Sequence, residues 1–387
     1  MRGFPALLEA ELQALSAIDR RRECPEAAGS SRLSIEVAGK PMLSFCSNDY
    51  LGLASHPALL AAATEAAVRD GFGASASRLV AGDLPAHREL EGALAAFLDR
   101  PSSLVFPSGY QTNVGVLTAL AGRDDLIVSD ALNHASLVDG CRLSRARVEI
   151  YPHGDAAAAR RLLDAAGPAR RRLLVTESLF SMDGDIAPLA ALAETAAATD
   201  SILVVDEAHA FGALGPGGRG LCAAAGVDPD VMIATLGKAV GAAGGFVAGP
   251  RELRDLLVNR ARTFVFTTAL PPPVAAAATA AIRLIAGPEG DRLRSRLAEH
   301  IASMTVDLGR RGLVTSRAPG PIVPIVLGAE TRALQVAASL RQRGFFVPAI
   351  RPPTVPAGSS RLRVTLSAAH EPADIQGLAA ALTECLA

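Results

Sequence analysis

The sequence predicts a three-layer α/β fold, in which helices cover both faces of a mostly parallel β-sheet, with a smaller α+β domain at the C-terminal end. From about residue 104 to residue 247, short apolar runs alternate with longer runs of helical character. Such alternation is typical of βαβ units, whose strands run parallel. Half of the 387 residues are hydrophobic, which is enough for one large domain and a smaller one.

Seven candidate strands make up the predicted sheet, and helical stretches separate them. The strands are residues 104–106, 126–129, 148–151, 173–176, 202–206, 232–235 and 245–247. The helices are residues 111–120, 135–143, 156–165 and 188–199. In such sheets, functional residues gather just beyond the carboxyl ends of the strands.

The large domain is expected to span residues 42–287, because a polar segment with glycine and proline follows at 287–291. Residues 288–387 would form the small domain, with strands near 322–327 and 362–366, a helix at 331–343 and a final helix. Residues 1–41 would form an N-terminal arm made of a helix and a hairpin that turns at Gly39 and Lys40.

Composition excludes several classes of function. The 38 basic residues nearly balance the 39 acidic ones, and aromatic residues are only 4%, so nucleic acid and anionic membranes are not expected partners. The long uncharged stretches, 101–122 and 263–282, contain polar residues or a proline triplet and do not read as membrane spans. Five cysteines without CxxC spacing indicate reduced thiols in a cytoplasmic protein and no metal site.

An acid and a histidine follow the apolar strand 202–206. Asp206 ends this strand and His209 comes three residues later, where either could contact a cofactor ring. The alternative is structural, with the acid capping a turn and the histidine filling a gap. Glu207 alternates to the opposite side of the strand end, so no role is assigned to it.

Lys238 stands in a run of glycine and alanine after the next strand, with no other charged residue from 231 to 249. A lysine in apolar surroundings has a lowered pKa, and the neutral amine can form a Schiff base with a carbonyl. An exposed surface lysine is the alternative. It is disfavoured because Lys40 is the only other lysine in the chain.

Other strand-to-helix turns carry further polar residues. Ser108, Gly109 and Tyr110 begin a helix whose free backbone N–H groups could bind phosphate, although an ordinary turn remains an equal alternative. His134 lies at another such turn, and Ser181 follows the strand 173–176. The segment 215–220 matches GxGxxG, but it neither directly follows a strand nor opens a convincing helix, so it is interpreted as a flexible loop.

These residues together match the needs of one cofactor. Pyridoxal phosphate requires a lysine for the Schiff base, an acid at the ring nitrogen, a phosphate site and a group on the ring face. The sequence supplies them, in that order, as Lys238, Asp206, the turn at Ser108 and Gly109 with Thr235, and His134.

The sequence resembles the α-oxoamine synthases, which are fold-type I pyridoxal-phosphate enzymes, in motifs between about residues 43 and 370. The motifs are SNDYLGL at 47–53, GFGASASRL at 71–79, HRELE at 87–91, FSMDG at 180–184, DEAH at 206–209, TLGK at 235–238 and RLR at 361–363. The resemblance implies a homodimer with active sites shared between the subunits.

The resemblance also implies the roles of individual residues. Lys238 would bind the cofactor covalently and act as general base, and Asp206 would keep the ring nitrogen protonated. His134 would stack on the ring, and His209 and Ser181 would bond to its phenolic oxygen. The residues implied to hold the phosphate are Gly109, Tyr110, Thr235 and, from the partner subunit, Thr267 or Thr268.

Residues 350–358, IRPPTVPAG, are most similar to the biotin-pathway member of the family. That member condenses L-alanine with a pimeloyl thioester, carried on CoA or acyl carrier protein, and releases CO2 and the thiol. Arg363 would hold the carboxylate of alanine. The other implied substrate residues are Asn48, Ser77, Thr354 and one of Arg20, Arg21 and Arg22, of which Arg21 is the candidate. Alternatives are a sibling such as glycine C-acetyltransferase or 5-aminolevulinate synthase, and a non-catalytic protein of the same fold.

Overall fold

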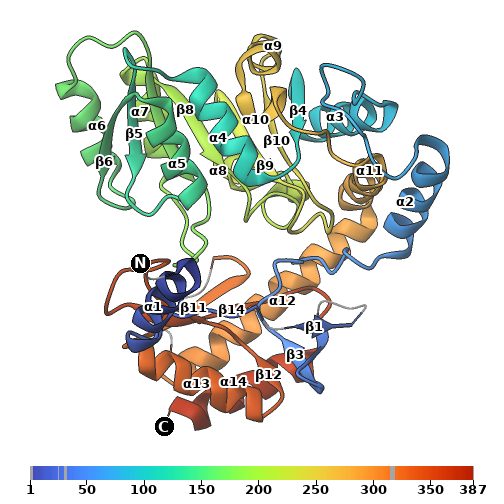
Figure 1. Ribbon diagram of the computed structural model, residues 1–387, viewed down its shortest axis with the longest axis vertical. Helices are drawn as coiled ribbons and strands as arrows, with labels where there is room; N and C mark the ends of the chain where they lie inside the picture. Colours follow the sequence, from blue (N-terminus) through green and yellow to red (C-terminus); the bar gives the residue numbers. More distant parts are fainter. Residues whose placement is uncertain (1–2, 25, 30–32, 314–318, 387) are drawn as a thin grey trace. The chain divides into compact units, whose positions relative to one another are not determined.

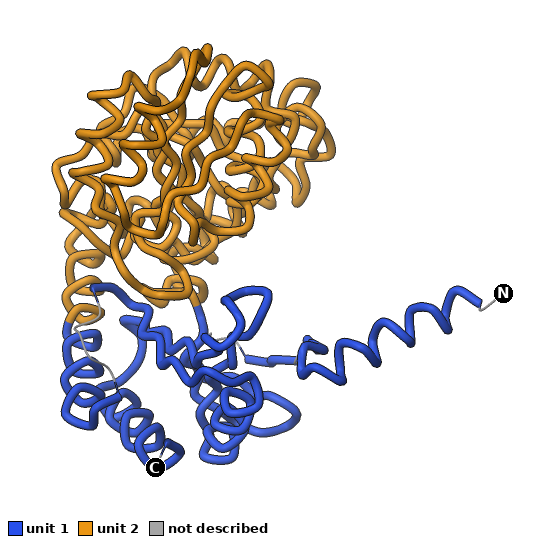
Figure 2. The backbone as a smooth tube through the Cα atoms, turned by 90° about the vertical axis from the view of Figure 1, so that its left-hand side faces the viewer, with its two compact units in different colours: residues 1–47, 299–387 blue, residues 48–298 orange. Residues whose placement is uncertain are grey.

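The computed structural model describes residues 3–24, 26–29, 33–313 and 319–386. The chain forms two compact units, one of residues 48–298 and one that combines residues 1–47 with residues 299–387 (Figure 2). Helix α12 (Pro288–Arg310) contains the second boundary between them.

A seven-stranded sheet forms the centre of the unit of residues 48–298 (Figure 1). Its order is β4-β10-β9-β8-β7-β5-β6. The strands are β4 (Ser102–Phe106), β5 (Leu126–Asp130), β6 (Arg147–Tyr151), β7 (Arg172–Glu177), β8 (Ile202–Asp206), β9 (Val231–Thr235) and β10 (Gly245–Gly249). Strands β5 to β9 pair in parallel, and only β10 runs antiparallel to its neighbours. The predicted mostly parallel sheet is confirmed, with each strand within two residues of its expected bounds.

Helices pack on this sheet because successive side chains of each strand point to opposite faces. On one face, α4 (Gly109–Leu120), α5 (Ala135–Ser144), α9 (Arg251–Arg260) and α10 (Arg262–Val265) share a buried apolar cluster with the strands. Helices α6 (Ala156–Ala165) and α7 (Leu189–Ala198) contact each other and strands β5, β6 and β8. The remaining helices of the unit are α2 (Pro57–Asp70), α3 (Pro85–Leu98), α8 (Leu221–Ala225) and α11 (Pro272–Ala286), with a 3-10 turn η1 (Pro216–Gly218).

The second unit contains two small sheets. One has the order β1-β2-β3-β12, from β1 (Ala27–Ala28), β2 (Ser34–Val37), β3 (Lys40–Ser44) and β12 (Phe345–Phe346). The other has the order β11-β14-β13, from β11 (Ile322–Gly328), β14 (Ser360–Thr365) and β13 (Ala349–Ile350). Helix α13 (Glu330–Gln342) packs on strands of both sheets and on α14 (Pro372–Leu386), and α1 (Phe4–Ala17) buries none of its side chains.

The N-terminal hairpin belongs with the C-terminal segment. Strand β3 pairs in parallel with β12, and the ring of His370 stacks on Phe45 at 4.2 Å while its Nε2 lies 3.1 Å from the Ser44 carbonyl oxygen. The sequence placed residues 1–41 in a separate arm and the start of the small domain at 288. The compact units join residues 1–47 to 299–387, in keeping with these pairings between the two ends of the chain, and the predicted domain bounds stay a prediction.

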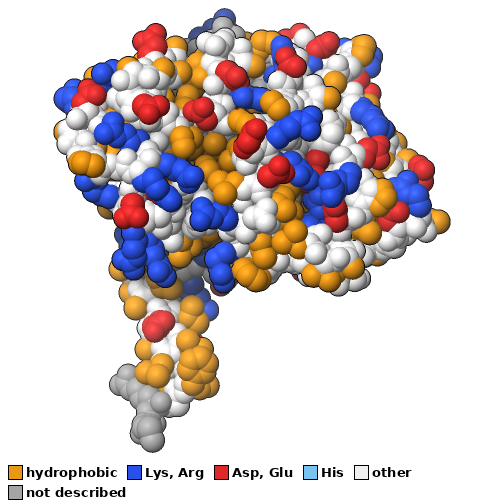
Figure 3. Space-filling view, turned by 90° about the horizontal axis from the view of Figure 1, so that it is seen from above, with side chains coloured by type: hydrophobic (Ala, Val, Ile, Leu, Met, Phe, Trp, Pro, Cys, Tyr) orange, Lys and Arg blue, Asp and Glu red, His pale blue; other side chains and the backbone are white. Residues whose placement is uncertain are grey.

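Acidic and basic side chains are mixed on the face drawn in Figure 3, in keeping with the balance of acidic and basic residues. Among the residues that the structure describes, no helix is both long enough and apolar enough to cross a membrane.

Candidate active site

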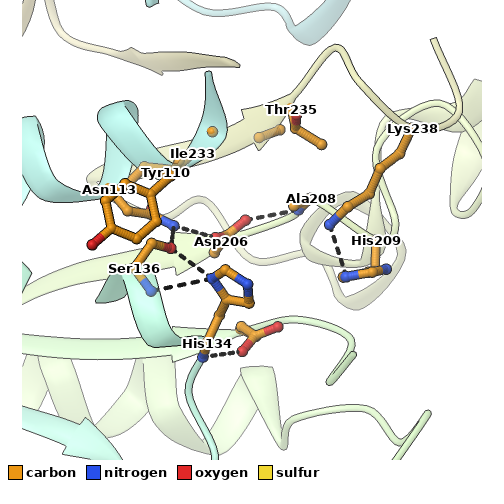
Figure 4. A pocket seen from close by; sticks show the side chains of 13 residues that line it. Tyr110, Asn113, His134, Ser136, Asp206, Ala208, His209, Ile233, Thr235 and Lys238 are labelled. Atoms are coloured by element: carbon orange, nitrogen blue, oxygen red, sulfur yellow. Dashed lines mark hydrogen bonds between the residues drawn. The ribbon is translucent and has the colours of Figure 1, made fainter. Parts of the chain in front are cut away.

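A pocket opens at the carboxyl ends of the parallel strands β7, β8 and β9, where the starts of α4 and α5 meet them (Figure 4). It lies wholly within the unit of residues 48–298. Seven residues singled out from the sequence line it: Gly109, Tyr110, His134, Asp206, His209, Thr235 and Lys238. The edge predicted to carry function is therefore the edge where these side chains gather.

Lys238 begins a chain of hydrogen bonds that runs into the protein interior. Its Nζ lies 2.7 Å from Nε2 of His209, and Nδ1 of the same ring lies 2.6 Å from the hydroxyl of Tyr50. Tyr50, fully buried, in turn donates to Asn48 Oδ1 at 3.3 Å. If the Lys238 ammonium donates to Nε2, then Nδ1–H donates to the Tyr50 oxygen, and every group in the chain is satisfied. The relay fixes both the orientation and the tautomer of His209.

The turn that carries Lys238 depends on Gly241. The N–H of Gly241 donates to the Lys238 carbonyl oxygen at 2.8 Å, and Gly241 has φ of +71°. A Cβ at this position would lie 2.5 Å from the backbone nitrogen of Ala54. Glycine is needed here for both its conformation and its size.

Asp206 lies between the two groups of side chains in the pocket (Figure 4). Its Oδ2 accepts a hydrogen bond from Asn113 Nδ2 at 2.7 Å, and its Oδ1 accepts one from the N–H of Ala208 at 2.8 Å. These two hydrogen bonds fix the orientation of the Asp206 side chain. Asp206 is 6% exposed and lines the pocket.

His134 is held as a neutral ring. Its Nδ1 accepts from the N–H of Ser136 at 3.2 Å and lies 2.7 Å from the Ser136 hydroxyl, which itself accepts from Asn113 Nδ2. Burial lowers the pKa of His134 and outweighs the charge of Asp206, which raises it, while the charge of Lys238 adds a smaller lowering effect. The Nε2–H tautomer follows from these contacts.

Glu177 is a buried acid that the sequence analysis did not single out. It stands in register with Asp206 across the parallel pair β7–β8, and its Oε1 accepts from the N–H of His134 at 2.5 Å. Burial and the nearby charge of Asp206 raise the pKa of the Glu177 carboxyl well above its usual range. The pocket thus contains, beside Asp206, a second carboxyl group, that of Glu177, which is biased toward its neutral form.

The start of helix α4 forms the other end of the pocket. Ser108 caps the helix through its Oγ, which accepts from the N–H of Gln111, and Gly109 and Tyr110 line the cavity. The first N–H groups of a helix have no intrahelical acceptor and carry partial positive charge, which suits an anion. Strand β10 can approach this turn only because residue 245 is glycine: a Cβ there would lie 2.7 Å from the nitrogen of Gly109.

Comparison with known proteins identifies the family. The profile of the family "Aminotransferase class I and II" matches residues 40–382. The 8-amino-7-oxononanoate synthase of Anaeromyxobacter sp. (strain K) is 53% identical over 387 residues, covering 100% of this chain and 96% of that protein. The enzyme of the same name from Bordetella petrii is 49% identical over 383 residues, covering 97% and 96%. The chain belongs to the class I and II aminotransferases, in the 8-amino-7-oxononanoate synthase family.

Solved structures agree with this family and fold. A serine palmitoyltransferase from S. paucimobilis with bound PLP matches with a TM-score of 0.93 and 31% identity, covering 99% of this chain and 98% of that one. The 8-amino-7-oxononanoate synthase from Francisella tularensis matches with a TM-score of 0.77 and 28% identity, covering 89% and 98%. The predicted three-layer, fold-type I architecture, the α-oxoamine synthase resemblance and the pyridoxal-phosphate dependence are confirmed.

The polar groups that line the pocket fit pyridoxal phosphate. A lysine amine, a carboxylate held by two donors, a neutral imidazole and the start of a twelve-residue helix all face one cavity. These groups suit an aldehyde, a ring nitrogen, a ring face and a phosphate, respectively.

Other predicted site residues lie elsewhere in the same unit. Ser181 is 8% exposed, in the hairpin that follows β7, and does not line the described pocket. Thr267 is half-buried and Thr268 exposed, and this segment meets the segment of Ser77 through a 3.0 Å hydrogen bond from Ala269 N–H to the Ala76 carbonyl oxygen. Their roles stay predictions.

The remaining predicted residues, Arg21, Thr354 and Arg363, belong to the other unit. Arg363 is 7% exposed on β14, and its Nη1 donates to Thr365 Oγ1 at 3.2 Å. Thr354 accepts from Arg22 Nη2 at 3.2 Å. Arg21 is exposed.

Four residues in or behind the site were not predicted as individuals from the sequence, although the first of them stands inside the quoted motif at 47–53: Tyr50, Asn113, Ser136 and Glu177. Asn113 lies four residues after Gly109, one helical turn along the same face of α4. Glu177 is a charged residue at the end of a buried strand. Helical spacing from Gly109 could have identified Asn113, and alignment of the strand ends could have identified Glu177.

The GxGxxG segment is a hydrogen-bonded turn rather than the expected flexible loop. The N–H of Gly212 donates to the Gly218 carbonyl oxygen and that of Gly220 to the Leu214 carbonyl oxygen, and helix α8 begins directly afterwards. Its last glycine, Gly220, allows the Glu207 carboxylate to approach: a Cβ there would lie 2.7 Å from Glu207 Oε2.

Proposed function

We propose that the protein condenses L-alanine with a pimeloyl thioester, with loss of CO2 and release of the thiol, to form 8-amino-7-oxononanoate for biotin synthesis. The observation that carries this proposal is the name shared by relatives about 50% identical over nearly the whole chain. The pocket supports it, because its donor set suits pyridoxal phosphate and leaves a lysine amine in place as a base.

Bound pyridoxal phosphate would supply an electron-withdrawing ring that stabilises negative charge at the α-carbon of the amino acid. Lys238 would take the α-proton at Nζ, and the relay through His209 and Tyr50 would hold that amine in place. Asp206, held in place by hydrogen bonds from Asn113 and Ala208, would supply the negative charge opposite the ring nitrogen. The neutral ring of His134 would cover the ring face without adding positive charge.

The three neighbouring arginines differ in their contacts, which favours Arg21 as the residue for the far carboxylate of the pimeloyl chain. Arg20 Nη2 lies 3.7 Å from Glu330, and Arg22 donates to Thr354 and to the Pro352 carbonyl oxygen. Among the described residues, the Arg21 guanidinium has no ion pair or hydrogen bond and is exposed. A free guanidinium can bind a carboxylate through two parallel N–H groups.

We also propose that the active enzyme is a homodimer in which Thr267 or Thr268 contributes to the phosphate site of the partner subunit. This part of the proposal draws on the family resemblance. Phe266, next to Thr267 in the chain, is 71% exposed, and an exposed apolar side chain at this place is compatible with a subunit contact.

Thiol release from a matrix of amino acids and acyl thioesters tests the reaction. The amino acids are alanine, glycine and serine, and the thioesters are pimeloyl-, acetyl- and palmitoyl-CoA. Alanine should exceed glycine by roughly tenfold to a few hundredfold, because a missing methyl group is worth about 1–3 kcal/mol. If glycine with acetyl-CoA is the best pair, the assignment fails and a glycine-using sibling replaces it.

Matched variants test the residues. Lys238→Ala should abolish thiol release. Arg21→Ala should raise KM for pimeloyl-CoA roughly tenfold or more with little change in KM for alanine, while Arg20→Ala, which loses only its contact with Glu330, serves as the control. Equal effects of the two arginine substitutions would contradict the choice of Arg21.

A further inference from the structure

His153 connects three segments of the large unit outside the pocket. It follows strand β6, and its Nδ1 lies 2.9 Å from Oδ1 of Asp130 while its Nε2 lies 2.8 Å from Oδ2 of Asp185. Asp130 ends strand β5 and is almost fully buried, and Asp185 stands in the hairpin after β7. One imidazole ring therefore links the ends of two strands to this hairpin.

The two contacts require a charged ring. A carboxylate can only accept hydrogen bonds, whereas a neutral imidazole has a single N–H. Both nitrogens of His153 face carboxylate oxygens, so both contacts are hydrogen bonds only when the ring is an imidazolium. Burial alone would lower the pKa of His153, but the hydrogen bonds to Asp130 and Asp185 outweigh it and raise the pKa above its ordinary value.

The hairpin that Asp185 anchors is the one that carries Ser181. Leu179 and Ile186 form a bridge, the N–H of Phe180 donates to the Asp185 carbonyl oxygen at 3.0 Å, and the ring of Phe180 packs edge-on against His153 at 4.3 Å. At its base, Ser178 donates its hydroxyl to Glu207 at 2.7 Å and its N–H to the Asp206 carbonyl oxygen at 2.9 Å. One end of the hairpin is thus fixed beside the pocket, and the other is fixed by His153.

The other polar groups close to His153 are either neutral or bonded elsewhere, so Asp130 and Asp185 are its ionic partners. Asp130 also accepts from the N–H groups of Leu132 and Gly154. Tyr151 is buried on β6, and burial together with the charge of Asp130 raises the pKa of its hydroxyl, so it stays neutral. Asp155 is occupied in capping α6 through Ala158 N–H, and its second oxygen lies 3.8 Å from Arg161.

We propose that His153 is a positioning residue whose protonated ring clasps the Ser181 hairpin, residues 178–187, to strands β5 and β6, and that the clasp loosens when the ring loses its proton. The clasp itself does not depend on the proposed reaction. Only its link to turnover, through Ser181, rests on that function.

The sign of the pH dependence follows from the raised pKa. The clasp contributes fully below the ordinary histidine value of about 6.5 and is lost as the pH rises through the raised value of the folded protein. Above that value, one nitrogen presents a lone pair to a carboxylate, which replaces an attraction by a repulsion.

Hydrogen exchange of the hairpin measures the clasp directly. Exchange of residues 178–187 would be followed by mass spectrometry between pH 5.5 and 8.5, with each rate divided by the intrinsic rate at that pH. In the unmodified protein, protection of the hairpin should fall by roughly three- to tenfold across this range, since a charge-assisted hydrogen bond at a partly exposed site is lost. His153→Gln should show the low protection at every pH, because its amide does not titrate.

Two further variants complete the design. Asp185→Asn keeps Asp130 in place and removes only the partly exposed carboxylate, so it should flatten the pH dependence even if His153→Gln fails to fold. His56→Gln removes a histidine that contacts Glu289 at 3.2 Å and should leave the hairpin unchanged. Protection that does not vary with pH in the unmodified protein, or that varies equally in Asp185→Asn, overturns the proposal, whatever the thiol-release matrix shows.

Discussion

Glu207 should be among the most costly residues to remove, although it does not line the pocket. It is fully buried, and its carboxylate accepts three hydrogen bonds: from Ser178 Oγ at 2.7 Å, Leu221 N–H at 3.0 Å and Cys222 N–H at 2.5 Å. These bonds join the end of β7 to the start of α8, on either side of the segment that carries His209.

The expected decrease in the free energy of unfolding follows from the number of hydrogen-bond donors that lose their acceptor. Each buried donor without a partner costs about 1–3 kcal/mol, and Glu207→Ala leaves three. Loss of the carboxylate also removes the cost of burying it, so we expect the free energy of unfolding to fall by roughly 3–5 kcal/mol. Glu207→Gln keeps one oxygen for Ser178 and Leu221 but turns an NH2 toward the Cys222 N–H, and should lose about 1–3 kcal/mol.

Urea denaturation of the cofactor-free protein tests this order. Far-UV circular dichroism is the suitable signal, because the chain contains no tryptophan. Glu194→Ala, at an exposed position of α7, is the matched control and should change the free energy of unfolding by less than about 0.5 kcal/mol. If Glu207→Ala loses no more than Glu194→Ala, the hydrogen bonds to Glu207 do not hold these segments together and the reasoning is wrong.

Three further outcomes are expected. Tyr50→Phe removes the 2.6 Å contact with His209 and should lower kcat roughly tenfold, with the circular dichroism spectrum unchanged; an unaltered kcat would show that the tyrosine hydroxyl does not position His209. Gly241→Ala places a Cβ 2.5 Å from Ala54 N and should sharply reduce the yield of folded protein. Gly309→Ala, in α12 with no atom within reach of the new Cβ, should instead raise the free energy of unfolding by about 0.5–1 kcal/mol. Equal melting temperatures of the two variants would contradict this. In iodoacetamide labelling followed by peptide mass spectrometry, exposed Cys24 should react first, while Cys141, whose pKa burial raises to about 11, and buried Cys222 should react only after unfolding.

The order of the strands along the chain could be predicted because each is a short apolar run between clear helical stretches. Strand β8, residues 202–206, matches its expected bounds, since Asp206 ends the apolar run. The antiparallel direction of β10 could not be predicted in the same way. A five-residue strand fits between β4 and β9 in either direction, and only the short loop from Thr235 to Gly245 favours a reversal.

Helices α2 and α3 escaped the sequence analysis although both begin with proline, at Pro57 and Pro85. Proline suits the first turn of a helix because its missing N–H has no intrahelical acceptor there. A proline inside an apolar run was instead interpreted as an interruption of that run. Helix α11 begins with Pro272 in the same way, so the place of a proline in the first turn of a helix is the information that was left unused.

The pocket could be predicted better than its supports for a physical reason. Lys238, Asp206 and His134 stand at turns after strands, where position in the sequence translates directly into position at one edge of a sheet. Glu207 and Glu177 act through partners that lie far away in sequence: Cys222 is 15 residues from Glu207, and His134 is 43 residues from Glu177. The alternation of side chains along β8 places Glu207 on the side away from the pocket, as expected. It cannot show which hydrogen-bond donors Glu207 meets there. A buried carboxylate needs donors, so an acid adjacent to a catalytic acid at a strand end should lead one to expect a second, structural network behind the site rather than an idle side chain.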